Sequence, residues 1–254
     1  ETTAVEIDIP AASTREVAFP EAVLDQPKLW HFDRPHLYAL EVRLSRRGKP
    51  VHGLRETFGV RRIEVRGTQF LLNGEPVRLA GVERMAGSHP GFGMAEPAAW
   101  IVHDHDDLKD LNCVFSRVHW QQDRRVMDYC DRKGILIQVE VPTWGSDTFR
   151  KPEGNPLEEL TANGLEQIGE MVRRERNHPC VFSWGLCNEV DGQNPAAQEF
   201  VRRMLKEAKR LDPGRLCAYA SNSLQGTPER DVSGEMDFVE WNEYYETWYG
   251  GDPE

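Results

Sequence analysis

From residue 77 onward the sequence repeats a short apolar stretch followed by an amphipathic stretch, and this repeat constrains the fold more than any other feature. The apolar stretches have the length of strands and occupy residues 77–82, 113–119, 135–141, 180–187, 216–221 and 236–241. The stretches between them have helical spacing and end at helix-stopping residues such as Gly134 and Pro213. This alternation is typical of a parallel sheet. Because a closed eightfold barrel takes about 250 residues, we predict an α/β fold with the first six βα units of a (β/α)8 TIM barrel.

The residues before this repeat have the two-residue period of β-strands. Apolar and polar side chains alternate in residues 5–9 and 38–44, and Arg47-Gly48-Lys49-Pro50 has the composition of a tight turn. A hairpin is predicted next, with strands at residues 63–65 and 70–72 followed by the turn Asn73-Gly74. We therefore expect a partial β-sandwich domain over residues 1–64. A barrel domain, incomplete at its C-terminal end, is expected over residues 65–254.

Charge and cysteine content narrow the functional classes. The 254 residues carry a formal net charge of −11, whereas surfaces that bind phosphate backbones are basic, so no nucleic-acid partner is expected. No apolar run has the length of a membrane span, so no membrane partner is expected either. Five cysteines without a CxxC pair or zinc-like spacing predict reduced, buried thiols. No pattern indicates a cofactor, and none specifies a localisation.

Catalytic groups of such barrels lie at the carboxyl ends of the strands. In this sequence those ends carry carboxylates, amides, imidazole and aromatic rings: Glu83, Arg84, His119, Trp120, Glu140, Asn188, Glu189, Asn222, Asn242, Glu243, Tyr244 and Tyr245. Amides and carboxylates bind hydroxyl groups, and aromatic faces stack on sugar rings. The expected partner is therefore a carbohydrate substrate.

The pair Asn188-Glu189 gives the most specific functional indication in this set. It follows the largely apolar residues 181–187, so an amide and a carboxyl group end a buried strand. Spacing alone leaves two interpretations open. Glu189 could donate a proton to a leaving glycosidic oxygen while Asn188 binds the sugar 2-hydroxyl, or the pair could only cap the following helix.

Several motifs follow one another along the chain. Before the barrel they are Pro27-Lys28-Leu29-Trp30, Pro35-His36-Leu37-Tyr38 and Phe58-Gly59-Val60-Arg61. At its entry and within it they are Phe70-Leu71-Leu72-Asn73-Gly74-Glu75-Pro76-Val77, Asn177-His178-Pro179, Trp184-Gly185-Leu186-Cys187-Asn188-Glu189 and Asn242-Glu243-Tyr244-Tyr245. This ordered set resembles glycoside hydrolase family 2, the family of β-galactosidases, β-glucuronidases and β-mannosidases. The resemblance implies an immunoglobulin-like sandwich before the barrel, and it favours the acid/base interpretation of Glu189 over the capping one.

The resemblance also implies a reaction: hydrolysis of terminal β-linked sugars, of the β-galactoside or β-glucuronide type, with retained configuration. Retaining enzymes place two carboxyl groups about 5–5.5 Å apart across the glycosidic bond. Glu189 maps onto the acid/base, and the nucleophilic Glu is expected on a seventh strand outside this chain, so the 254 residues alone are expected to be inactive. The resemblance implies substrate contacts from Asn188, His119, Glu140, Asn242, Tyr244, Tyr245, Arg84, Trp120 and Trp248. No cofactor and no metal ligands are expected, and the full-length parent could be a homo-oligomer.

Two departures from the family pattern concern the sugar. The family usually shows Arg-His-Glu after the first strand, whereas this chain has Arg84-Met85-Ala86. Arg117 lies one residue closer to His119 than in the family, and such a slip is expected to turn its side chain to the other face of the strand. The identity of the sugar is therefore left open. The alternative function is a non-catalytic carbohydrate-binding module on a glycosidase scaffold.

Three other features have plain structural interpretations beside the functional ones. His103 and Asp107 lie four residues apart on a predicted helix, where a solvated acidic face is favoured over a metal site. Glu140 interrupts an apolar strand, so it is expected to bind substrate or to pair with a buried arginine such as Arg117. Trp120 could be a sugar platform or ordinary packing at the rim of the barrel, and Trp144 and Trp248 share these alternatives.

Overall fold

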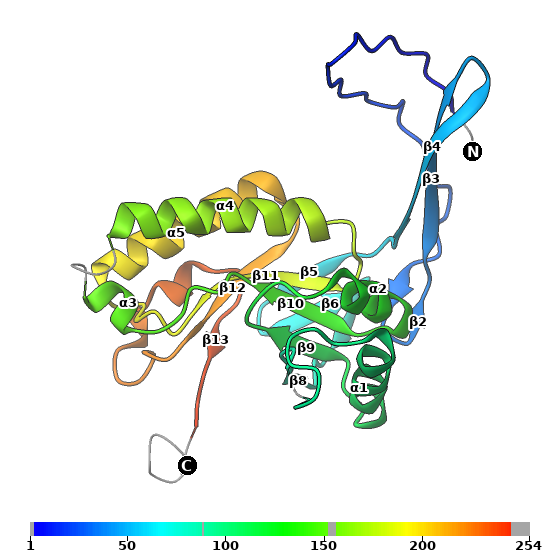
Figure 1. Cartoon of the computed structure of the whole chain (residues 1–254). Coiled ribbons are helices and arrows are strands. Elements are labelled where there is room, and N and C mark those ends of the chain that lie inside the picture. Colours follow the sequence, from blue (N-terminus) through cyan, green and yellow to red (C-terminus); the bar gives the residue numbers. More distant parts are fainter. Residues whose placement is uncertain (1–2, 88, 152–155, 245–254) are drawn as a thin grey trace.

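The centre of the structure, a computed structural model that describes residues 3–87, 89–151 and 156–244, is a six-stranded parallel sheet in the order β13-β12-β11-β10-β9-β8. Its strands are β8 (Gly81–Glu83), β9 (Phe115–Val118), β10 (Leu136–Glu140), β11 (Val181–Asn188), β12 (Leu216–Ser221) and β13 (Glu240–Trp241). Each strand pairs with the strands that precede and follow it in the chain (Figure 1). This order confirms the predicted first six units of a TIM barrel.

The sheet curls so that one of its faces is concave. Gln138 of β10 donates a hydrogen bond from Nε2 to Oε2 of Glu240 at 2.8 Å, although two strands separate β10 from β13. Ser183 of β11 donates from Oγ to the side-chain oxygen of Gln138 at 2.5 Å. Side chains of non-adjacent strands can meet in this way only on the inside of a curved sheet. The inner face of the half-barrel is therefore polar where Gln138, Ser183 and Glu240 meet.

Helices cover the sheet (Figure 1). They are α1 (Ala98–Asp110), α2 (Arg124–Lys133), the short α3 (Asp147–Arg150), α4 (Leu157–Glu175) and α5 (Pro195–Leu211), with 3-10 turns η1 (Pro228–Arg230) and η2 (Val232–Glu235). α2 ends as predicted, at Gly134 with a left-handed φ of 73°. α4 and α5 approach closely at Gly164, where a Cβ atom would lie 3.0 Å from Phe200 and Met204. None of the helices in the described ranges has the length and apolar character needed to cross a membrane.

Small antiparallel sheets precede the barrel. β1 (Trp30–His31) pairs with β2 (Arg34–Pro35), β3 (Tyr38–Arg46) pairs with β4 (Lys49–Phe58), and β5 (Ile63–Arg66), β6 (Gln69–Leu72) and β7 (Glu75–Val77) form a three-stranded sheet. The predicted turn between β3 and β4 is present, with positive φ at Arg47 and Gly48. The β3–β4 ribbon points away from the barrel (Figure 1). An antiparallel β region followed by a parallel barrel is the predicted fold class.

Two of the strand predictions are wrong. Residues 5–9 form no strand, because no strand in the described part of the chain pairs with them and alternation alone supplies no hydrogen bonds. Residues 77–82 are not one strand either. Val77 pairs with Phe70 as the last residue of β7, and the parallel strand starts only at Gly81. The turn at Asn73-Gly74 thus adds a third antiparallel strand before the chain enters the barrel.

The N-terminal region is fixed to the barrel at the amino ends of the strands. Trp30 is fully buried and donates from Nε1 to the carbonyl oxygen of Asp131 at 2.8 Å. Arg61 donates from Nε to the carbonyl of Pro179 at 2.9 Å and from Nη2 to that of Val181 at 2.5 Å. Burial, helped by the nearby charge of Arg215, lowers the pKa of Arg61 to about 9. These contacts close one end of the half-barrel and leave the carboxyl ends of the strands for a site.

Candidate active site

The carboxyl ends of the strands bring one set of polar side chains together. Glu83 ends β8, Arg117 lies near the end of β9, and Glu140 ends β10. Register places Glu83 beside Arg117 and Arg117 beside Gln138. Residues two apart on a strand share a face. His119 and Glu140 therefore lie on the same concave side of the sheet as Arg117 and Gln138. This side is where a barrel binds its substrate.

Arg117 is the centre of this set. Its Nη1 donates to Glu83 Oε1 at 2.8 Å, and its Nε and Nη2 donate to Glu140 Oε2 at 3.1 and 2.8 Å. Nη2 also donates to Asn188 Oδ1 at 2.8 Å. The expectation that Arg117 faces away from the site is therefore wrong. Arg117 and His119 are two residues apart, which puts both on one face, and the register with β8 and β10 aims that face inward.

Glu140 is 1% exposed, and its predicted pairing with Arg117 is confirmed. Burial raises the pKa of Glu140 to about 8, although the Arg117 charge acts against the shift. Gly185 of the neighbouring strand makes room for this side chain, because a Cβ atom there would lie 2.8 Å from Glu140 Cβ. Any larger residue at position 185 would displace the carboxyl group.

The raised pKa of Glu140 predicts that the protein becomes less stable as pH rises from about 5 to 8. The ordinary pKa of a glutamate is 4.5, so between that value and about 8 the unfolded chain has released a proton that the folded protein still holds. The unfolded state then binds fewer protons, and the free energy of unfolding falls with pH. Urea unfolding followed at pH 5, 6, 7 and 8 checks this. Glu140→Gln should flatten the pH dependence, and an equal slope in the variant would contradict the assignment.

Asn188 and Glu189 form the part of the site at the end of β11. Asn188 is 3% exposed, and Glu189 is half-buried with a left-handed φ of 53°. Asn242 donates from Nδ2 to Glu189 Oε1 at 2.7 Å and to Asn188 Oδ1 at 3.0 Å. Positive φ is uncommon outside glycine and clusters at functional sites. The capping interpretation fails, because α5 starts after Asn194, whose side chain accepts from the backbone of Ala196.

His119 and Glu83 form a hydrogen-bonded pair at the open side of the set. The hydrogen bond that His119 makes to Glu83 raises the pKa of His119, and partial burial acts against this shift. Partial burial acts to raise the pKa of Glu83, but the hydrogen bond from His119 and the charge of Arg117 outweigh it and lower that pKa. Both shifts favour an imidazolium beside a carboxylate.

The remaining predicted residues lie in different surroundings. Arg84 is buried but directed to α1 and the segment before it, where it bonds to Glu96 at 2.8 Å and to Asp104 at 2.6 Å. Trp120 is half-buried and lines a cavity of about 210 Å³ together with Gln121, Glu140, Val141, Pro142, Gln167, Glu170 and Met171. Trp144 is 64% exposed, and Tyr244 is half-buried after β13. Tyr245 and Trp248 lie outside the described residues.

Our sequence analysis missed two members of the inner face, Gln138 and Glu240, and considered Glu83 only as one of many strand-end residues. Gln138 is fully buried and donates to Glu240, and burial raises the pKa of Glu240. A signal was present, since both residues interrupt apolar strands and buried polar groups need partners. The partner of each, however, lies on a distant strand.

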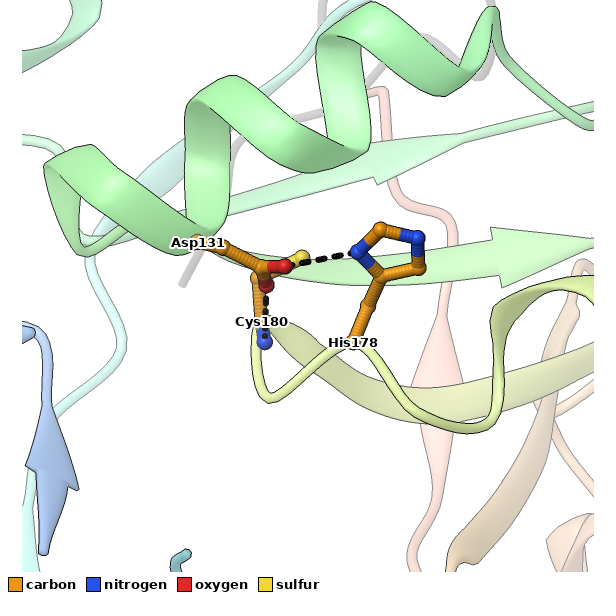
Figure 2. A group of neighbouring side chains, drawn as sticks. All are labelled: Asp131, His178 and Cys180. Carbon is orange, nitrogen blue, oxygen red and sulfur yellow. Dashed lines mark hydrogen bonds and ion pairs between the residues drawn. The ribbon is translucent and has the colours of Figure 1, made fainter. Parts of the chain in front are cut away.

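A second cluster of chemically active side chains lies at the opposite end of the strands (Figure 2). Asp131, His178 and Cys180 are buried, and their ligand-type atoms lie within 4.8 Å of one another. Asp131 accepts from His178 Nδ1 at 2.6 Å and from the backbone N–H of Cys180 at 3.0 Å. Burial raises the pKa of the Cys180 thiol well above its usual value, so the sulfur keeps its proton. Asp131 thus binds both His178 Nδ1 and the backbone of Cys180, and the cluster holds α2 against the start of β11.

The predictions for the cysteines and for the polar face of α1 agree with the structure. All five cysteines are buried and free, as expected. His103 and Asp107 lie on the exposed side of α1, 3.7 Å apart, where a solvated face was predicted.

Asp131→Asn should lower the free energy of unfolding by about 1–3 kcal/mol, because the buried His178 and the backbone of Cys180 lose a charged acceptor. Urea unfolding of the variant and the wild type measures the difference. Asp107→Asn is the matched control on an exposed carboxylate and should change stability by less than about 0.5 kcal/mol. An equal effect in both variants would show that the cluster has no structural role.

Comparisons with known proteins match most of this chain. A family model described as "Glycosyl hydrolases family 2, TIM barrel domain" matches residues 63–252, and one described as "Glycosyl hydrolases family 2" matches residues 2–61. A β-glucuronidase of Streptococcus agalactiae serotype V is 32% identical over 242 residues, and a β-galactosidase of Thermoanaerobacter pseudethanolicus is 32% identical over 223 residues. The crystal structure of a β-galacturonidase from Eisenbergiella tayi, bound to galacturonate, superposes with a TM-score of 0.79 at 28% identity.

These matches cover most of this chain but a minor part of each relative. The S. agalactiae protein is matched over 89% of this chain and 39% of its own length, and the T. pseudethanolicus protein over 85% and 28%. The E. tayi structure is matched over 89% of this chain and 39% of that chain. The chain thus spans less than two fifths of the length of these relatives.

Proposed function

Because this chain belongs to glycosyl hydrolase family 2, we propose that the protein hydrolyses terminal β-linked sugars with retention of configuration and that Glu189 is its acid/base. The observation that carries the proposal is the end of β11. There the Glu189 carboxyl group stands at the substrate-binding end of the barrel, held at one oxygen by Asn242. A carboxyl group at this end of the barrel is the kind of group that protonates a leaving glycosidic oxygen.

We propose that the remaining predicted site residues bind the sugar. Asn188 and Asn242 present amide groups beside Glu189, and His119 presents an imidazole directly after β9. Trp120 adjoins a cavity that also reaches Glu140. We propose these as substrate contacts, together with Arg84, Tyr244, Tyr245 and Trp248.

The nucleophile is proposed to lie outside these 254 residues. A nucleophilic carboxylate must be ionised and free to attack the anomeric carbon. Burial raises the pKa of Glu140 and of Glu240, which favours their neutral forms. Glu83 is ionised but already accepts from Arg117 and His119. None of these three fits the role, which supports a carboxylate from a further strand of the barrel.

The domain organisation is proposed as an immunoglobulin-like sandwich over residues 1–64 and a barrel over residues 65–254. Two separate family models support a division near this point, since one matches residues 2–61 and the other residues 63–252. The proposed boundary falls within β5 (Ile63–Arg66), and the rest of the β5–β7 sheet lies on the barrel side of it.

Turnover of chromogenic glycosides tests the proposed function. The protein from the complete reading frame is assayed with 4-nitrophenyl β- and α-glycosides of galactose, glucose, glucuronic acid and galacturonic acid. Release of nitrophenol from a β-glycoside and not from its α-anomer is expected. Saturable sugar binding without turnover of any member would instead favour the non-catalytic carbohydrate-binding module.

A further inference from the structure

The geometry points to Asn242 as the positioning residue of the acid/base, which fixes the carboxyl oxygen of Glu189 that carries the proton, an inference that rests on the proposed function. Asn242 follows β13, and its backbone N–H donates to the carbonyl oxygen of Ser221 at 2.9 Å. This bond holds Asn242 beside the end of β12. From there its side chain reaches Asn188 and Glu189 at the end of β11.

The direction of these hydrogen bonds is set by Arg117. A guanidinium group has donors and no acceptor. The Asn188 atom that lies 2.8 Å from Arg117 Nη2 therefore has to be the amide oxygen Oδ1. The same oxygen lies 3.0 Å from the amide group of Asn242, which has to present its nitrogen in turn. The orientation of both amide groups thus follows from the donors of Arg117.

The amide nitrogen of Asn242 uses both of its hydrogens, which leaves Oδ1 for a sugar hydroxyl. One hydrogen goes to Asn188 Oδ1 at 3.0 Å and the other to Glu189 Oε1 at 2.7 Å. An N–H group bonds best to an oxygen that carries no proton, so Oε1 is the unprotonated oxygen of the Glu189 carboxyl group. Within the described residues Oε2 has no hydrogen-bond partner. In the acid form of Glu189 the proton is therefore on Oε2.

The backbone of Glu189 is held independently of Asn242. Its N–H donates to the carbonyl oxygen of Ala220 at 2.8 Å, and its carbonyl oxygen accepts from Ser146 Oγ at 3.1 Å. The carboxyl group, in contrast, is held by Asn242 alone among the residues that the structure describes. The last torsion of a glutamate has two broad, nearly equivalent positions. Without the bond from Asn242 the carboxyl group would rotate and carry its proton on either oxygen, which slows proton transfer to the leaving group.

The dependence on the leaving group tests the inference. The protein from the complete reading frame and its Asn242→Leu variant are assayed with phenyl and 2,4-dinitrophenyl β-glycosides of one sugar. Leucine is close to asparagine in size and has no donor, so kcat/KM for the phenyl glycoside should fall on the order of 10- to 100-fold. The dinitrophenyl leaving group needs little protonation, so its glycoside should lose less than about threefold. A loss of the same factor on both substrates would show that Asn242 only binds the sugar or supports the fold, and would overturn the inference.

Two further variants make the result specific to the donor of Asn242. Asn242→Asp keeps the size of the side chain, but its carboxylate would attract the proton of Glu189 to Oε1. It should show the same dependence on the leaving group, and it replaces Asn242→Leu if that variant does not fold. Asn73→Asp is the matched control, because it removes an amide that donates to the carbonyl oxygen of Trp30 at 2.9 Å, away from the site. A dependence as strong in Asn73→Asp as in Asn242→Leu would contradict the inference.

A thermodynamic cycle separates this inference from the proposed function. Urea unfolding is measured for Asn242→Leu, Glu189→Met and the double variant. The double variant should unfold with an equilibrium constant on the order of 2- to 10-fold below that expected from the two single changes. Additive changes would overturn the positioning role, whether or not a glycoside is turned over. If no glycoside is turned over but the changes are not additive, the proposed hydrolysis fails and Asn242 still holds Glu189. If the loss in Glu189→Gln depends on the leaving group and that in Asn242→Leu does not, the inference fails while the proposed function stands.

Discussion

Glu189→Gln is expected to lower kcat/KM for 4-nitrophenyl β-glycosides by about 10²- to 10⁴-fold, the range that general acid–base catalysis contributes. The glutamine keeps an oxygen that can accept from Asn242, so the local structure should survive. It has no proton to give to the leaving oxygen and cannot activate water in the second step. Initial rates of nitrophenol release by the wild type and the variant measure the loss.

The matched control for this loss is Glu235→Gln. Glu235 pairs with Arg202 at 2.7 Å on the surface, away from the strand ends that carry the site. Its replacement should leave kcat/KM within a factor of about two, because surface ion pairs contribute little to stability. If Glu189→Gln is as active as this control, Glu189 is not the acid/base.

Arg117→Met is expected to destabilise the protein by about 1–3 kcal/mol at pH 8, because buried polar groups lose their charged donor. Asn188 loses the bond from Nη2, and Glu140 loses the bonds from Nε and Nη2. Without Arg117 the pKa of Glu140 rises further, because the guanidinium charge acts against its upward shift, so Glu140 takes up a proton at pH 8. At pH 5 Glu140 is protonated, so the loss should be smaller. Urea unfolding at both pH values measures it.

The double variant Arg117→Met with Glu140→Gln separates the charge effect from the loss of packing. Removing both side-chain charges should restore part of the stability at pH 8, because the folded protein then no longer has to hold a proton on Glu140 that the unfolded chain releases. Losses that simply add, or that are equal at pH 5 and pH 8, would show that the Arg117–Glu140 pair does not determine stability.

The fold was largely predictable because its strongest signals are local. The change from a period of two residues to alternating strands and helices predicted the parallel sheet and its six strands. Gly134 marked the end of α2. Residues 5–9 show the limit of this kind of prediction. Their alternation is as regular as that of β3, but a strand also needs a neighbouring strand to pair with. The sequence of the segment itself does not reveal that neighbour.

The site was predictable only at the positions that follow a strand directly. Asn188 and Glu189 stand out because polar residues end an apolar stretch. Arg117 was assigned to the wrong face because its spacing to His119 was compared with that of the family, whereas a separation of two residues by itself puts both side chains on one face. Gln138 and Glu240 meet across two intervening strands, and such a contact depends on how far the sheet curls, which no local pattern specifies.

The dependence of Glu189→Gln on the leaving group tests the central claim most directly. The wild type and the variant are assayed with phenyl, 4-nitrophenyl and 2,4-dinitrophenyl β-glycosides of one sugar, whose leaving groups need progressively less protonation. If Glu189 is the acid, the variant should lose most activity on the phenyl glycoside and least on the dinitrophenyl glycoside when the first, glycosylation step is measured through kcat/KM. A loss of the same factor on all three substrates would contradict proton donation by Glu189.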